Sequence, residues 1–183
     1  MKNKIIVVNK YFFRCDIMGL NKEKMKQVIH YIVHKCQDKP NFGKTVLYKL
    51  MYFSDFNHYE IYETLITDEV YIRLDNGPAP SHFESLCDEL KNENKINNKK
   101  VPVYDRERDL HFSLEEPDTS LLNEKELEVI DTVIEDLSDM NATQISEYSH
   151  GDKPWRVARL YEALDPEFVF YRSDEYSVRI YDE

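Results

Sequence analysis

Three residues of this chain combine types and spacing that could bind a metal ion. Asp55 and His58 are three positions apart, so an α-helix would place them as neighbours on one face. His150, arriving from a later segment, would complete a set of one oxygen and two nitrogen ligands. The pattern is a weak metal signal, because no HExxH motif occurs and spacing places no second carboxylate or cysteine nearby. Metal-assisted chemistry is therefore an alternative hypothesis here.

A structural role for Asp55 is the hypothesis that its neighbours favour. At 100° per residue, one stripe of the helix would carry Tyr48, Tyr52, Asp55, Tyr59 and Tyr62. A half-buried carboxylate on that stripe would accept hydrogen bonds from tyrosines or pair with a cation such as Arg73, because a buried charge is tolerated only when it is paired. Structural polar groups outnumber catalytic ones, so we expect a polar cluster in the core.

Other catalytic schemes have less support. The chain contains no GxSxG, P-loop or GxGxxG motif and only four glycines, so neither a nucleophile elbow nor a phosphate cradle is indicated. Cys87 is predicted on the apolar face of a helix, which favours an inert buried thiol. Tyr148 and His150 could form an acid/base pair, but "EYSHGDKPW" is more typical of a helix end and turn. There Trp155 would pack into the core, while His150 and Asp152 would hydrogen-bond to backbone groups left unpaired at the helix end. We expect no catalytic residue and no cofactor.

Composition narrows the choice of partner. A chain of 183 residues suffices for one domain with its own core, and three widely spaced cysteines (Cys15, Cys36, Cys87) indicate a reducing, cytoplasmic setting. The net charge of -11 argues against binding to nucleic acid, which requires a dense basic face. The N-terminal apolar run is too short for a membrane span. Thirteen tyrosines and nine phenylalanines favour a protein interface.

Periodicity predicts a helical domain of the α+β class. The expected helices are 21–37 with Asn21 as cap, 42–62, 80–90, one opened by Asn123 and Glu126 as a capping box, 141–149, and one from Pro154 through Leu160. Helix 42–62 is apolar around most of its circumference, which is typical of a central helix. The fold class we predict is α+β, a predominantly helical single domain with a small antiparallel β-sheet or hairpin.

The strands and loops are read from alternation and turn residues. Residues 69–74 are predicted to form a strand that ends in the turn "DNGPAP", and residues 91–100 a polar loop. Residues 101–114 are predicted to form a hairpin that turns near 106–109. Residues 1–20 are interpreted as an arm or a short strand, with Met18 as an alternative start, so that residues 1–17 could lie outside the native protein. Residues 165–183 are interpreted as a strand or an extended tail.

Several spaced motifs carry a family resemblance. They are a K-L-x-Y-F-x-D-x-x-H-Y helix, an I-T-x-x-x-Y-x-R strand that ends in G-P-x-P, and a late S-H-x-x-x-P-W. They are met by Lys49, Leu50, Tyr52, Phe53, Asp55, His58, Tyr59, Ile66, Thr67, Tyr71, Arg73, Gly77, Pro78, Pro80, Ser149, His150, Pro154 and Trp155. In this order, over about residues 22–160, they resemble the Panacea domain, the SocA-like domain of antitoxins that also occurs in phage-associated GepA-like proteins. We assign residues 21–164 to that domain.

The resemblance implies a non-catalytic antitoxin that neutralises a cognate protein toxin by direct contact. Some relatives deliver the toxin to an ATP-dependent protease, which would be a second partner. Many relatives carry an added DNA-binding region, but this chain has no recognisable helix-turn-helix, so operator binding is not expected. The N-terminal arm and the C-terminal tail lie outside the motifs and are candidates for setting partner choice. Two alternatives stay open: a small metal-dependent enzyme using Asp55, His58 and His150, and a phage-associated protein that binds and modulates a host target.

The candidate binding residues, for a toxin or for a structural polar cluster, lie on the predicted central helix, the strand and turn, and the late motif. They are Tyr52, Asp55, His58, Tyr59, Tyr71, Arg73, Asp75, Gly77, Pro78, His150 and Trp155. Arg73, Asp75 and the Gly77-Pro78 turn would shape one binding edge, or would simply end a strand and form a turn.

Overall fold

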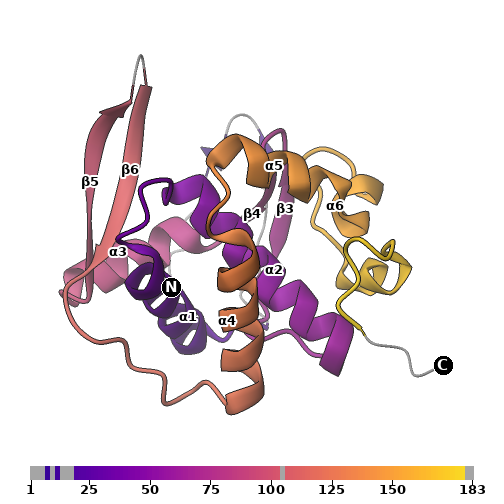
Figure 1. Ribbon diagram of the computed structural model, residues 1–183, viewed down its shortest axis with the longest axis horizontal. Coiled ribbons are helices and arrows are strands. Elements are labelled where there is room, and N and C mark those ends of the chain that lie inside the picture. The colour runs from indigo at the N-terminus through magenta and orange to yellow at the C-terminus, as the bar shows by residue number, and fades with distance from the viewer. Residues whose placement is uncertain (1–6, 9–10, 13–18, 104–105, 180–183) are drawn as a thin grey trace.

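A long central helix organises the fold (Figure 1). The computed structural model describes residues 7–8, 11–12, 19–103 and 106–179. Helix α2 (Lys44–Tyr62) contacts α1 (Lys22–Cys36), α4 (Glu124–Leu137), α5 (Ala142–Gly151) and strand β4 (Gly77–Pro80). Its buried residues occur on nearly all sides, from Val46 to Glu60, which confirms the prediction of a central helix.

Helix ends follow the local capping rules. The Asn21 side chain accepts a hydrogen bond from the Lys24 backbone N–H at 3.1 Å, which caps α1 as predicted. Asn123 and Glu126 form the predicted capping box of α4, and Asn141 forms a second one with Gln144 at α5. No helix in the described part of the chain is both long and apolar enough to cross a membrane.

Residues 77–80 form a strand, which corrects the prediction of a turn over "DNGPAP". Strand β3 (Tyr71–Leu74) pairs antiparallel with β4, with Tyr71 opposite Pro80 and Leu74 opposite Gly77, so the turn is only Asp75 and Asn76. Backbone N–H groups alternate in direction along a strand, so prolines at every second position remove donors from one edge only. The other edge of β3 pairs with residues 161–164, through the bridge between Ile72 and Ala163.

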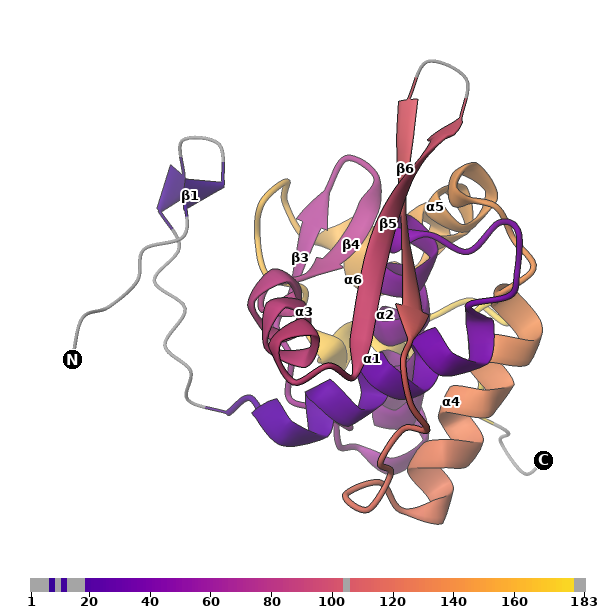
Figure 2. The ribbon, with the colours of Figure 1, turned by 90° about the vertical axis from the view of Figure 1, so that its left-hand side faces the viewer.

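The second hairpin is longer than predicted and begins earlier. Strand β5 (Ile96–Val103) pairs with β6 (Arg106–Ser113), so the predicted loop over 91–100 is half strand, and the predicted turn at 106–109 lies within β6. Fully buried Ile96 anchors the base, and the polar side chains beyond it belong to a hairpin that stands out from the helices (Figure 2). The polar residues from 97 to 100 therefore belong to a solvent-exposed strand, although their composition predicts a loop.

Three further elements differ from the predictions in their limits. Helix α3 (Phe83–Asn92) begins after Pro80, because that proline belongs to β4. Helix α6 (Lys153–Val157) ends before Ala158 and Leu160, which were predicted inside it. Residues 166–171 form a 3₁₀ helix, η1 (Pro166–Tyr171), instead of a strand, because Asp165 caps the N–H of Glu167 and Pro166 favours a helical first turn.

The class prediction is confirmed: the fold is helical α+β with small antiparallel strand pairs. A short pair, β1 (Val7–Val8) and β2 (Tyr11–Phe12), precedes the helices. The predictions for residues 1–6 and 180–183, for Cys15 and for a start at Met18 concern residues outside the described ranges. Cys36 and Cys87 are buried free thiols, and burial raises the pKa of Cys87 to about 12, which fits an inert thiol.

Candidate functional site

Asp55 is a buried hydrogen-bond acceptor that holds the next loop and β3 against α2. Its Oδ1 accepts from the backbone N–H groups of Ile66 at 2.8 Å and Thr67 at 2.9 Å. Its Oδ2 accepts from Thr67 Oγ1 at 2.6 Å and from the Tyr71 hydroxyl at 2.8 Å. Burial raises the pKa of Asp55 to about 6, and these four donors oppose the rise. The predicted phenol partner is present, whereas Arg73 lies elsewhere.

Removing one of these donors gives a measurable test of the cluster. We expect Tyr71→Phe to lower the free energy of unfolding by about 2 kcal/mol, because a buried carboxylate loses a charged hydrogen bond and gains nothing in return. Urea denaturation of both proteins at pH 7.5 measures the change. Tyr171→Phe is the matched control, since that side chain is 68% exposed and should change stability by less than about 0.5 kcal/mol. Equal effects of the two substitutions would contradict a structural role for the Tyr71 hydroxyl.

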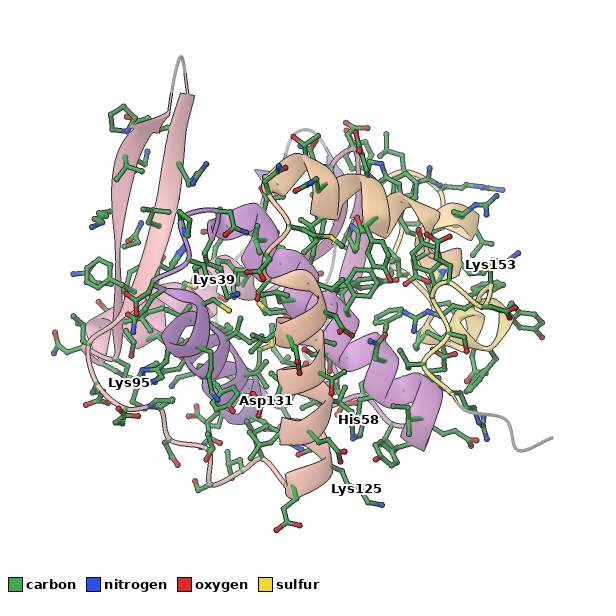
Figure 3. All side chains as sticks on the ribbon, viewed as in Figure 1. Lys39, His58, Lys95, Lys125, Asp131 and Lys153 are labelled. Atoms are coloured by element: carbon green, nitrogen blue, oxygen red, sulfur yellow. The ribbon has the colours of Figure 1, made fainter. Side chains whose placement is uncertain are left out.

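The structure does not bring Asp55, His58 and His150 together. His58, on the side of α2 that faces the start of α4, has its Nδ1 2.6 Å from the carbonyl oxygen of Thr64 (Figure 3). Burial lowers its pKa, so a neutral ring donates from Nδ1 to that carbonyl. His150 stacks on Trp155, with ring centroids 4.2 Å apart. Within the described ranges, no group of three or more His, Cys, Asp or Glu side chains is arranged to hold a metal ion.

A second cluster joins β3 to the late motif. The Arg73 guanidinium lies 3.9 Å from the ring centroid of Trp155 and donates to the carbonyl of Ala158 at 2.5 Å. Trp155 Nε1 donates to the carbonyl of Leu74 at 3.3 Å. Two buried nitrogens of the cluster, Arg73 Nε and His150 Nε2, have no hydrogen-bond partner in the described part of the chain. Asp75 is exposed at the turn beside them.

Lys49 and Gly77 pack together under this cluster. Lys49 is 2% exposed, and its Nζ donates to the carbonyl of Pro78 at 2.9 Å. Burial lowers the pKa of Lys49 to about 7. Gly77 has φ +93°, and a Cβ at this position would overlap Ser149 Oγ and the Lys49 side chain. Glycine is therefore required here both by conformation and by space.

A buried ionic network fastens the C-terminal segment, and its key residue was missed from sequence. Arg172 donates from Nε and Nη2 to the two oxygens of Asp152, at 2.9 and 2.7 Å. Its Nη1 donates to Glu60 at 2.7 Å and to Asn57 at 2.9 Å, while the Tyr52 hydroxyl donates to Asp152 at 2.8 Å. Asp152 thus binds side chains, which corrects its predicted role at loose backbone groups. The sequence does contain one signal for this network. Glu60 lies on the apolar helix α2, and a buried carboxylate requires a cation beside it.

Tyr59 lies apart from all of these residues. Its hydroxyl donates to the Glu167 carboxylate, and this hydrogen bond raises the pKa of Tyr59 to about 12. The predicted site residues therefore fall into separate groups. Tyr52, Asp55 and Tyr71 lie in the core, and Arg73, His150 and Trp155 lie beside Gly77 and Pro78. His58 contacts Thr64 and Tyr62, and Tyr59 contacts Glu167 and Phe170.

Comparison with known proteins adds a family match. The family model described as the antitoxin SocA-like, Panacea domain matches residues 47–156. These residues run from the first turn of α2 into α6 and contain the Asp55 cluster, the Lys49 and Gly77 contact and the Trp155 stack. No curated protein and no solved structure matches the chain.

Proposed function

The chain belongs to the SocA-like antitoxin family defined by the Panacea domain, and from that premise we propose that it is an antitoxin that neutralises a protein toxin by direct contact. The observation that carries the proposal is the family match over more than half of the chain, from residue 47 to residue 156. We infer that the protein acts by binding and not by catalysis. The identity of the partner as a toxin and the mechanism of neutralisation by contact both belong to this proposal.

The burial of the motif residues supports a scaffold role for them. Tyr52, Asp55 and Tyr71 are each at most 2% exposed, so a partner cannot contact them without unfolding the core. Their hydrogen bonds join α2 to the following loop, to β3 and to Asp152 between α5 and α6. We infer that these residues fix the shape of the domain and that the toxin contacts exposed residues elsewhere.

Charge supports a basic toxin as the partner. The net charge of -11 would attract a basic protein over long range and raise the rate of association, most strongly at low salt. Toxins that act on nucleic acid or on the ribosome bind phosphate groups and therefore have basic surfaces, which are complementary to this acidic chain. We place the encounter in the cytoplasm, where the free thiols of Cys36 and Cys87 stay reduced.

Co-expression tests the proposal. The flanking open reading frame is expressed from a repressible promoter, and growth is scored with and without this protein. We expect growth arrest by the neighbour alone, rescue on co-expression, and a complex of the two proteins that survives purification. A neighbour that is harmless, or that stays toxic and does not copurify, would overturn the proposal.

Delivery to a protease is tested in the same strains. If the protein acts as an adaptor, the toxin half-life should fall several-fold on co-expression, and deletion of the ATP-dependent protease should restore it. If the protein acts by contact alone, rescue should persist in the deletion strain with an unchanged toxin half-life. We expect the second result, since direct binding is sufficient for neutralisation.

A further inference from the structure

Apolar side chains are exposed at one end of the molecule, where α6 and η1 pack beside each other and η1 packs on α2 (Figure 1). The described part of the chain exposes seven large apolar side chains, and four of them lie in this region. They are Val157 at 41%, Leu160 at 44%, Tyr171 at 68% and Val178 at 37%. We call the exposed side of α6, η1, residues 172–179 and the last turn of α2 the C-terminal face. Clustered apolar exposure of this kind marks interaction surfaces.

The C-terminal face also contains a hollow open to solvent. It is a shallow depression lined by Tyr59, Glu63, Glu167, Phe170 and Arg179. The rings of Tyr59 and Phe170 lie 5.8 Å apart and are tilted by 46°, so they form an aromatic wall. The Tyr59 hydroxyl donates to the carboxylate of Glu167, and the Glu63 carboxylate comes from the end of α2.

This lining suits a cationic side chain. Aromatic faces attract a guanidinium or ammonium group, and two carboxylates supply charge-assisted hydrogen bonds. The Nη1 of Arg179 already lies 3.9 Å from Glu63 Oε1, so one carboxylate of the lining is within ion-pair distance of a guanidinium. Along residues 156–179, which make up most of the C-terminal face, five exposed carboxylates stand against three exposed arginines. The face is therefore complementary to a basic segment that also carries apolar residues.

We propose that the C-terminal face is the docking surface for the protein toxin, with the hollow lined by Tyr59, Phe170 and the two glutamates receiving an arginine or lysine side chain of that partner. Exposed Tyr171 and Val178, next in sequence to Phe170 and Arg179 of the hollow, provide apolar anchors of the kind that a protein interface needs at its centre, and the carboxylates select a basic partner. The inference rests on the proposed function, because it names where the antitoxin contacts its toxin. Residues 157–179 of the face lie beyond the family match, whereas Tyr59, Glu63 and most of α6 lie within it.

The exposed face of α4 serves as the matched comparison. It carries Glu124, Glu128, Asp131 and Glu135 along one stripe, so its negative charge is at least as dense as that of the C-terminal face. The stripe carries no exposed large apolar side chain within the described residues and contributes no residue to the lining of the hollow, so it is an acidic surface without the apolar features of the C-terminal face. Charge reversal on α4 therefore separates general electrostatic attraction from docking.

The first experiment needs no toxin. The full chain, labelled with ¹⁵N, is titrated with N-acetyl-arginine amide, and backbone chemical shifts are followed by NMR. We expect saturable shifts at residues 59–63 and 167–170, no such shifts with N-acetyl-aspartate amide, and at least about tenfold weaker binding in the double variant Glu63→Lys, Glu167→Lys. Absence of an arginine-specific response at these residues would overturn the proposal.

The second experiment uses the complex. We expect the double variant Glu63→Lys, Glu167→Lys to bind the toxin at least about tenfold more weakly and to lose growth rescue, with an unchanged thermal melt. The control, Glu128→Lys with Glu135→Lys, makes the same change in charge and should alter affinity by less than about threefold. Equal losses in the two variants would overturn docking at the C-terminal face and leave the antitoxin function standing. If the wild-type protein neither binds nor rescues, the proposed function fails, and the arginine titration alone then decides whether the hollow accepts a cation.

Discussion

Replacing Arg172 by methionine is expected to lower the free energy of unfolding by about 3–5 kcal/mol, a large part of the stability of a domain of this size. The Arg172 and Asp152 side chains are completely buried, and that of Glu60 is 1% exposed. Methionine fills much of the space of the arginine stem but leaves both carboxylates without their cation in a medium of low dielectric constant. Urea denaturation of wild type and variant at pH 7.5 measures the loss.

Two further variants show whether the loss of stability comes from the buried, unpaired carboxylates or simply from the removal of an arginine. Arg159→Met removes an arginine whose side chain is 88% exposed, and stability should change by less than about 0.5 kcal/mol. Adding Asp152→Asn and Glu60→Gln to Arg172→Met removes the uncompensated charges, so we expect the triple variant to recover part of the loss. A loss below about 1 kcal/mol in the single variant, or no recovery in the triple variant, would contradict this account.

The same residue holds the proposed docking surface in place. Glu60, which Arg172 binds, also accepts hydrogen bonds from Ser177 Oγ at 2.5 Å and from the backbone N–H of Val178 at 3.3 Å. Residues 172–178 are therefore tied to α2 through one buried cluster. Because ordering a surface before binding reduces the entropy lost in the complex, Arg172 would contribute to the proposed partner interface without contacting the partner.

Local chemistry explains which parts of the fold could be predicted. The caps at Asn21 and Asn123 depend on residues within one turn, and the central position of α2 follows from its apolar circumference, so sequence was sufficient for both. The proline-rich strand β4 was read as a turn, because its pairing depends on which edge of the strand the prolines occupy. The β5–β6 hairpin was read partly as a loop, because a projecting strand has no buried face to impose alternation.

The polar clusters show where sequence reasoning stopped. Tyrosine was the expected partner of Asp55, and Tyr71 fills that role from β3, whereas the helix tyrosines bind elsewhere: Tyr52 donates to Asp152 and Tyr48 to Glu84. Arg172 meets Glu60 across 112 residues of sequence. A buried carboxylate predicts that a cation must exist, but only the packing of the C-terminal segment on α2 decides which one.

Substituting Lys49 by methionine is expected to stabilise the protein at pH 7 by about 2–4 kcal/mol. Lys49 is almost fully buried, and the only hydrogen bond of its Nζ in the described part of the chain is to the carbonyl of Pro78. Burial lowers the pKa of Lys49 from 10.5 to about 7, a difference that corresponds to about 4–5 kcal/mol. Loss of the hydrogen bond to Pro78 subtracts about 1–2 kcal/mol from the gain. Methionine has a similar length and no charge to desolvate.

The gain should depend on pH in a direction set by the lowered pKa. Between about pH 7 and 10.5 the unfolded chain keeps the Lys49 proton while the folded protein has released it, so wild-type stability from this group rises with pH. The difference between variant and wild type should therefore be largest at and below pH 7 and should shrink by about 1.4 kcal/mol per pH unit above pH 8. Taking the difference at each pH cancels the titration of groups that do not interact with Lys49. The nearby His150 does interact with it, but burial and the Lys49 charge both lower the pKa of His150, which places its titration below this pH window. Lys153→Met, at a partly exposed lysine, is the control and should give a flat difference within about 0.5 kcal/mol. A Lys49 variant that is less stable than wild type at pH 7, or whose difference does not vary with pH, would mean that the folded protein keeps the ammonium charged and stabilised beneath the Arg73, Trp155 and His150 cluster.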